Sequence, residues 1–299
     1  MRRPIALLLL GLWAVAPAQA APEPDLAYGA YQRGLYVTAL REATKRLEAN
    51  PEDAPAMTLL GELFNQGLGV AQDPTKAAEW YRLAAQQGDP HALSSLGLMA
   101  MDGRRIAKSP IQGLSFLEQA AAKGEASAAY NLALLKLSTG SQADLLRAVE
   151  LLRKAAEAEI GDAQHALGVL YLRGRGVNRD PAEAARWFER AARNGNLAGE
   201  VELAILLFNG DGVPKNEALA ARGFRRAALK GNAIAQNRLA RLYVGGRGVP
   251  QNRVEAAAWH LSAAAQGLAD AWLDNALKDL SPDDRARAEK IAAERSAAL

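Results

Sequence analysis

The chain has 299 residues, of which 49% are hydrophobic and 23% are charged, so it has enough apolar content to bury a core. It has no cysteine, which excludes disulfides, thiol catalysis, cysteine-ligated zinc and iron–sulfur clusters. The formal net charge is +3, and it falls to +1 without Arg2 and Arg3, because 34 basic residues then face 33 acidic ones. Charge therefore gives no support for nucleic-acid binding, and none is expected.

The first twenty residues have the order of parts of a secretory signal peptide. A positive start at Met1-Arg2-Arg3 precedes an apolar run of about eleven residues, Ile5–Val15, and then the small-x-small pattern of Ala18-Gln19-Ala20. The alternative is a membrane anchor, but the run is shorter than the roughly 20 residues that span a bilayer. We expect cleavage near Ala20, no stable membrane insertion afterwards, and a periplasmic location, since a cysteine-free secreted chain needs no disulfide machinery.

Two sequence markers repeat along the rest of the chain. A leucine followed by a small residue recurs in steps of 35 or 36 residues: Leu60-Gly61, Leu96-Gly97, Leu132-Ala133, Leu167-Gly168, Leu203-Ala204 and Leu239-Ala240. A double alanine recurs with the same steps: Ala84-Ala85, Ala120-Ala121, Ala155-Ala156, Ala191-Ala192, Ala227-Ala228 and Ala263-Ala264. Two markers that keep one period over six copies indicate a repeat architecture.

Each unit has the pattern of a helical hairpin, as residues 162–195 show. Apolar residues at spacings of three and four predict a helix over Asp162–Leu172, and the loop Gly174-Arg175-Gly176 ends it. Asp180-Pro181 predicts the start of the second helix, because Asp accepts hydrogen bonds from first-turn amides and Pro tolerates the first helical position. Gly195 ends that helix. One hairpin cannot bury its own apolar face, so six are expected to stack in line.

The combined motif resembles the Sel1-like repeat, a relative of the tetratricopeptide repeat. The pattern is Leu-Gly-x-Leu-Tyr-x-x-Gly-x-Gly-Val, an Asp-Pro-type restart, and Ala-x-x-Trp-Tyr/Phe-x-x-Ala-Ala-x-x-Gly, and it covers residues 53–267. The resemblance implies an all-α, right-handed superhelical solenoid of stacked helix-turn-helix repeats. Four departures mark the middle units: Arg105 at the second loop glycine, Lys136 at the Tyr position, a helix-ending glycine shifted to Gly161 with Glu159 in its usual place, and Gly223 at the Trp position.

Both ends of the repeat array are expected to carry caps. Residues 21–52 resemble a plain tetratricopeptide hairpin with a turn at Gly34-Leu35. Residues 268–299 contain a half repeat, Leu268 to Leu280, followed by a charged helix for which Ser281 is the predicted N-cap and Pro282 the first position. Polar terminal caps keep such arrays soluble.

No catalytic residue, metal site or cofactor is expected from the motifs. His91, His165 and His260 lie in different units without metal-binding spacing. The Gly-x-Gly loops lack the third glycine and the Gly-Lys-Ser/Thr ending of phosphate loops. The tryptophans at one repeat position, Trp80, Trp187 and Trp259, recur in step with the packing markers and are expected in the core.

One set of positions goes beyond the fold. In the first helix of each unit, the places two and five after the marker leucine share a side, which the resemblance implies is the concave surface. The middle units carry apolar residues there: Leu98, Met101, Leu134, Leu137, Val169, Leu172, Ile205, Phe208 and Val244. The first unit carries Glu62 and Asn65, and Arg173, Asn209 and Arg241 are expected at the rim. An exposed apolar strip usually marks a binding site, suited here to an amphipathic helix or extended peptide. The alternative is that a tight superhelix hides these side chains between repeats.

These observations predict a non-enzymatic scaffold or adaptor in the bacterial periplasm that binds another protein or peptide. The resemblance implies roles in envelope assembly, exopolysaccharide export or sensor-kinase regulation. One alternative is a β-lactam-binding or hydrolysing enzyme of the same family, but such relatives are cysteine-rich and this chain has neither cysteine nor a nucleophile–base pair. Another is a peptidoglycan or carbohydrate-fragment binder, for which only Tyr130 and Phe208 offer groove aromatics.

Overall fold

The computed structural model describes residues 25–103 and 107–298, so the predicted signal peptide (1–20) and Arg105 lie outside the described residues. The secondary structure in those ranges is helical, without strands. The helices are α1 (Leu26–Gln32), α2 (Tyr36–Ala49), α3 (Ala54–Gln66), α4 (Pro74–Gln86), α5 (Pro90–Asp102), α6 (Pro110–Ala122), α7 (Ala126–Thr139), α8 (Gln142–Glu157), α9 (Gly161–Arg173), α10 (Pro181–Arg193), α11 (Leu197–Asn209), α12 (Glu217–Leu229), α13 (Ala233–Gly245), α14 (Arg253–Ala265), α15 (Ala271–Leu277) and α16 (Pro282–Ala297).

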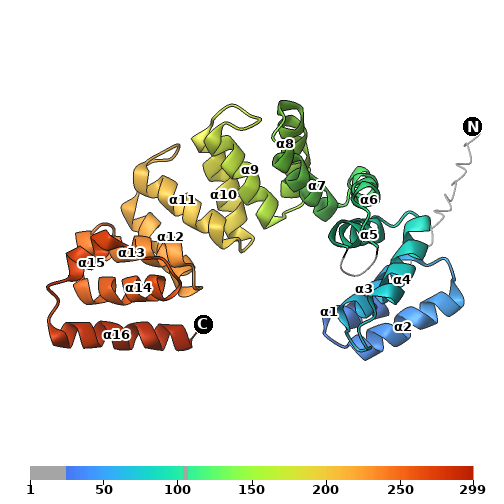
Figure 1. Cartoon of the computed structure of the whole chain (residues 1–299), viewed down its shortest axis with the longest axis horizontal. Coiled ribbons are helices and arrows are strands. Elements are labelled where there is room, and N and C mark those ends of the chain that lie inside the picture. The colour runs from blue at the N-terminus through green and yellow to red at the C-terminus, as the bar shows by residue number, and fades with distance from the viewer. Residues whose placement is uncertain (1–24, 104–106, 299) are drawn as a thin grey trace, which may run out of the picture.

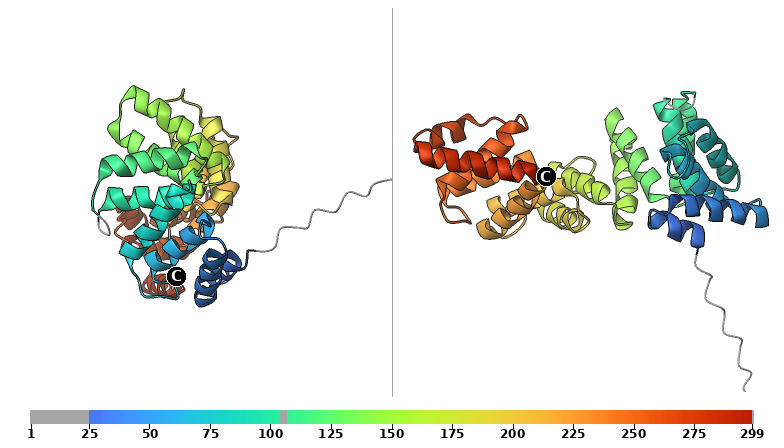
Figure 2. Two further views of the ribbon diagram at one scale, coloured as in Figure 1. Left: turned by 90° about the vertical axis from the view of Figure 1, so that its right-hand side faces the viewer. Right: turned by 90° about the horizontal axis from the view of Figure 1, so that it is seen from below.

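Consecutive helices pair into hairpins that stack along the chain. Each second helix also packs on the first helix of the next hairpin, as α10 does on α11. Figure 1 shows the hairpins following one another along an arch, with α1–α4 at one end and α13–α16 at the other. The view from below keeps these two groups at opposite ends (Figure 2). The prediction of an all-α solenoid of helix-turn-helix units is confirmed. None of the helices in the described ranges is long and apolar enough to cross a membrane.

The predicted helix starts are present as side-chain caps. Asp73 accepts a hydrogen bond from the amide of Lys76 at 3.0 Å, and Asp180 accepts from the amide of Glu183 at 3.0 Å. Pro74 and Pro181 occupy the first helical positions, where the missing N–H costs nothing. Local sequence therefore fixes where these two second helices begin.

Glycine is required where two parts of the array touch closely. A Cβ on Gly168 would lie 2.6 Å from Cε1 of Phe188, so the small residue after the marker leucine lets the two helices of one unit meet. Gly248 has φ +68°, and a Cβ there would lie 2.1 Å from the carbonyl oxygen of Glu217 in the preceding unit. Where the second loop glycine is present, it thus seats the loop on the start of the previous second helix, as at Gly69, Gly176, Gly212 and Gly248. Trp187 and Trp259 are buried as predicted, and Trp80 is half-buried.

The prediction of a shifted helix-ending glycine is wrong. Gly161 begins α9, and Glu159 itself adopts the left-handed conformation with φ 63°. Its carboxylate accepts hydrogen bonds from Gln164 at 2.9 Å and Asn194 at 2.7 Å, as well as from Arg190. These contacts, all three from the next hairpin, offset the cost of a left-handed non-glycine residue. The hydrogen bonds from Asn194, Gln164 and Arg190 also lower the pKa of Glu159 to about 2.

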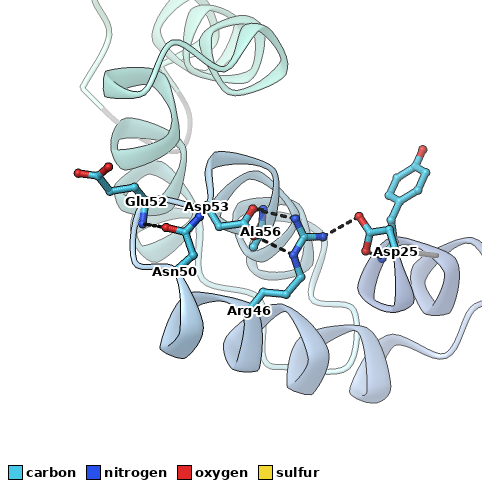
Figure 3. A network of polar contacts seen from close by, with 7 residues as sticks. Asp25, Arg46, Asn50, Glu52, Asp53 and Ala56 are labelled. Carbon is cyan, nitrogen blue, oxygen red and sulfur yellow. Dashed lines mark hydrogen bonds and ion pairs between the residues drawn. The ribbon is translucent and has the colours of Figure 1, made fainter. Parts of the chain in front are cut away.

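Polar contacts attach the two ends of the array. Arg46 on α2 donates to Asp25 at 2.6 Å and bidentately to Asp53 at 2.8 and 2.9 Å, which joins the first hairpin to the start of α3 (Figure 3). At the other end, the hydroxyl of Ser281 caps α16 as predicted, accepting from the amide of Asp284 at 3.1 Å. Helix α16 packs on α14, and Arg295 reaches Glu255 at 2.8 Å.

Candidate interaction site

The side chains of the predicted concave strip differ in exposure. Leu98 and Leu134 are 42% and 41% exposed. The other members are half-buried: Met101, Leu137, Val169, Leu172, Ile205, Phe208 and Val244. Among the predicted rim residues, Arg173 and Asn209 are exposed and Arg241 is half-buried. We call the nine apolar residues the apolar strip.

The half-buried members of the apolar strip also belong to the core. Met101 and Leu137 pack against the central hydrophobic cluster, and Ile205, Phe208 and Val244 pack against the C-terminal one. These side chains therefore stabilise the stacking of hairpins while part of each stays open to solvent. Leu98 and Leu134 are the members with the largest free surface.

The N-terminal end of the strip lies in an open hollow of about 620 Å³. The structure brings the polar residues Glu62 and Asn65 of α3 beside Leu98 and Met101 of α5. Glu62 accepts a hydrogen bond from the hydroxyl of Tyr81 at 2.6 Å. Burial, together with this carboxylate, raises the pKa of Tyr81. Among the residues that the structure describes, the lining of the hollow includes the carboxylates of Glu62 and Asp102 and no basic side chain.

The C-terminal end of the strip forms a smaller pocket of about 350 Å³, which we call the arginine pocket. It contains four of the predicted residues: Ile205, Phe208, Asn209 and Arg241. Six further residues complete its lining: Phe224, Arg238, Leu242, Gly245, Arg247 and Trp272. Leu98, Met101, Leu134, Leu137, Val169, Leu172, Arg173 and Val244 do not line it.

Two arginines of this pocket are held by carboxylates and aromatic rings. Arg241 donates to Asp270 at 2.7 and 2.8 Å, and its guanidinium lies 4.9 Å from the ring centroid of Trp272. Arg247 donates to Glu217 at 2.6 and 3.2 Å and lies 4.1 Å from the ring of Phe208. Hydrogen bonds from Arg247 and Lys215 lower the pKa of Glu217.

Three pocket residues that the sequence did not predict lie outside the positions two and five after the marker leucine. Arg238 precedes the marker leucine, Arg247 belongs to a loop, and Trp272 lies in the half repeat. Trp272 is 48% exposed, whereas Tyr130 and Phe208, the two aromatics named from the sequence, are half-buried. A helical wheel of α13 that included the residue before Leu239 could have found Arg238, because positions three apart share a face.

The histidines do not form a metal site. The Nδ1 atom of His91 lies 2.7 Å from Glu125, His165 packs against Phe188, and the Nε2 atom of His260 lies 2.7 Å from Asp274. Within the described ranges, no group of three or more His, Cys, Asp or Glu side chains could hold a metal ion.

Sequential hairpins around a partly open apolar strip define an α-solenoid repeat protein. The family model of the Sel1 repeat matches six segments: 54–89, 90–125, 126–159, 161–196, 198–232 and 233–268. The chain belongs to the Sel1 repeat family. Proteins of this family generally mediate protein–protein interaction and are typically non-enzymatic.

Solved structures with the same fold include two bacterial proteins. A Sel1 repeat protein from Oxalobacter formigenes is 27% identical, with 81% of this chain and 97% of that chain covered and a TM-score of 0.67. The protein c5321, a protective antigen present in uropathogenic Escherichia coli strains, is 26% identical, with 87% of this chain covered and a TM-score of 0.54. The match spans 64% of the c5321 chain. No curated protein matches this chain.

Proposed function

We propose that this protein is a non-enzymatic interaction module of the bacterial periplasm that binds a helix or extended peptide of a partner protein along the apolar strip. The observation that carries the proposal is the exposure of Leu98 and Leu134, 42% and 41%, within a run of partly open apolar residues. Exposed leucines on neighbouring first helices leave apolar area that a partner segment could cover. The family's general role in protein–protein interaction supports the same reading.

Site-specific crosslinking tests this proposal. A photoreactive phenylalanine analogue replaces Leu98 or Leu134, and in the control it replaces Leu83, which is 43% exposed but lies on the second helix of its hairpin. We expect one and the same envelope protein to crosslink from positions 98 and 134 and not from position 83. Equal crosslinking from position 83, or no shared product from the two strip positions, would contradict the proposal.

The purified partner then gives a quantitative test. Leu134→Glu should weaken its binding by about tenfold or more, because covering a leucine contributes roughly 1.5–3 kcal/mol and a buried carboxylate forfeits it. Leu83→Glu is the matched control and should bind as the wild type does. An unchanged melting curve for both variants shows that the loss is one of binding.

The location is tested by the mature N-terminus. The pattern of residues 1–20 supports export, and a chain recovered from the osmotic-shock fraction should begin at Ala21. Recovery of an uncleaved chain from the cytoplasm would contradict a periplasmic location.

A further inference from the structure

The arginine pocket lies at the C-terminal end of the apolar strip, between α11 and α13, with Trp272 of α15 in its wall. Phe208 and Trp272 supply aromatic walls, and Ile205 and Leu242 supply aliphatic ones. Its volume of about 350 Å³ is at the lower end of the range of small-ligand pockets. The space suits a single side chain or chain terminus of a partner.

Two of its three arginines are already balanced and fixed. Asp270 neutralises Arg241, and Glu217 neutralises Arg247. Each guanidinium also lies over an aromatic ring, Trp272 or Phe208, which further restricts its motion. A ligand that enters the pocket would not have to order these two side chains, and that lowers the entropic cost of binding.

The third arginine of the pocket is Arg238. Arg238 is exposed, and among residues 25–103 and 107–298 it forms neither a hydrogen bond nor an ion pair. Within the part of the chain that the structure describes, no carboxylate belongs to the lining of the pocket. The uncompensated positive charge of the pocket therefore rests on Arg238, beside apolar walls.

We propose that the arginine pocket binds a carboxylate attached to an apolar group, as an anchor for the partner segment in the apolar strip. That the carboxylate belongs to a partner protein rests on the proposed function. One free guanidinium matches the two oxygens of one carboxylate bidentately, and a single unbalanced positive charge suits a monoanion better than a phosphate dianion. The carboxylate comes from the C-terminus of the partner or from an Asp or Glu side chain beside an apolar residue.

Small probes test the pocket directly. N-acetyl-leucine presents a terminal carboxylate and is compared with N-acetyl-leucinamide. The peptide acetyl-Leu-Glu-amide presents a side-chain carboxylate and is compared with acetyl-Leu-Gln-amide. NMR follows the Arg238 Nε–H and Trp272 indole N–H resonances of the mature chain. We expect the better carboxylate probe to bind at least about fivefold more tightly than its neutral counterpart, as a charge-assisted hydrogen bond implies.

Arg238→Gln should remove the preference for the charged probe. The matched control is Arg222→Gln, which changes an exposed arginine of α12 outside the pocket and should keep the preference. Equal binding of charged and neutral probes, an unchanged preference in Arg238→Gln, or equal shifts at Arg222 and Arg238 would overturn the proposal. Preferred binding of N-acetyl-leucine indicates a terminal carboxylate, and preferred binding of acetyl-Leu-Glu-amide indicates a side-chain carboxylate.

This experiment fails separately from the test of the apolar strip. If the probes show no carboxylate preference while positions 98 and 134 still crosslink one partner, the arginine pocket is refuted and the interaction strip stands. If Arg238-dependent probe binding is present and the crosslinks are absent, the pocket stands and its role as an anchor for a strip-bound partner is refuted.

Discussion

Asp270 joins the last full repeat to the half repeat, and its replacement gives the sharpest stability prediction. Its buried carboxylate accepts hydrogen bonds from Asn237 at 2.7 Å and from Arg241 at 2.7 and 2.8 Å. It also caps α15, accepting from the amides of Trp272 at 3.1 Å and Leu273 at 3.3 Å. Because the buried residues of α15 are only Leu273 and Leu277, the local stability of this helix depends strongly on Asp270.

The magnitude follows from the pKa and from the cap. Burial pushes the pKa of Asp270 upward, but hydrogen bonds from Arg241 and Asn237 outweigh it and lower the pKa from 3.8 to about 2. Such a shift corresponds to about 2 kcal/mol by linkage, and screening at the 38%-exposed Arg241 reduces it to about 1–2 kcal/mol. The cap adds about 1 kcal/mol. Because the pKa is lowered on folding, this charge contribution is present above pH 3.8 and is lost as the pH falls through about 2.

Two substitutions separate the charge from the cap. Asp270→Asn keeps a good capping residue and removes the charge, so it should cost about 1–2 kcal/mol. Asp270→Ala removes both and should cost about 2–3 kcal/mol. Hydrogen exchange at pH 7 should therefore speed up in α15 by about tenfold for Asp270→Asn, and by about a further fivefold for Asp270→Ala.

The control removes an acid of the same segment. Asp279→Asn changes an exposed carboxylate just after α15 and should leave exchange in α15 unchanged. If Asp270→Asn and Asp279→Asn exchange at the same rate, the buried ion pair does not stabilise the half repeat and the reasoning fails.

Three further predictions concern backbone strain, helix packing and the pH dependence of stability. The Glu159→Gly variant should melt about 2–4 °C higher than Glu159→Ala, because both lose the carboxylate but only glycine tolerates φ 63° without strain. Equal melting temperatures of the two variants would argue against a strained backbone at this position. In urea titrations, Gly168→Ala should destabilise the protein, because overpacking against Phe188 costs about 1–3 kcal/mol. Gly29→Ala should stabilise the protein, because nothing lies within 4 Å of a Cβ at that position. A stabilised Gly168→Ala variant would contradict the close approach of the two helices. Burial lowers the pKa of His165 from 6.5, so the stability of the wild type should fall as the pH drops below 6.5. His165→Gln should lose that part of the pH dependence in thermal melts from pH 7 to 5. An equal slope of stability against pH in both proteins would refute this prediction.

The regular parts of the fold could be predicted because their signals are local. Asp180 and Pro181 start a helix through contacts within one turn, and the marker leucine with its small neighbour repeats in every unit. The conformation of Glu159 could not be predicted from local signals. No local pattern favours a left-handed glutamate, and the hydrogen bonds from Asn194 and Arg190 that offset its cost come from the next hairpin.

The candidate site was predicted in part for the same reason. Positions two and five after the marker leucine lie on one helical face, so Ile205, Phe208 and Arg241 could be placed together. Arg247 and Trp272 enter the pocket from a loop and from the half repeat, and no position rule for the first helix includes them. Nor could the sequence give the exposure of Leu98, because exposure depends on how closely neighbouring hairpins stack.

The polar contacts between hairpins vary in their separation along the sequence, so the repeat markers do not reveal most of them. Polar pairs that cross from one hairpin to the next are separated by 30 residues for Arg247 and Glu217, by 31 for Arg190 and Glu159, and by 33 for Asn237 and Asp270. The pair of Asn194 and Glu159 is separated by 35. The markers themselves recur every 35 or 36 residues. A comparison of equivalent positions therefore finds the packing of each unit but misses the pairs that cross at 30, 31 and 33 residues. These polar pairs are not repeated identically, so the junctions of the array differ. The arginine pocket arises at the last full hairpin, where Arg247 pairs with Glu217 of the preceding hairpin and Arg241 pairs with Asp270 of the half repeat. Among the described residues, Arg238 is left unmatched there.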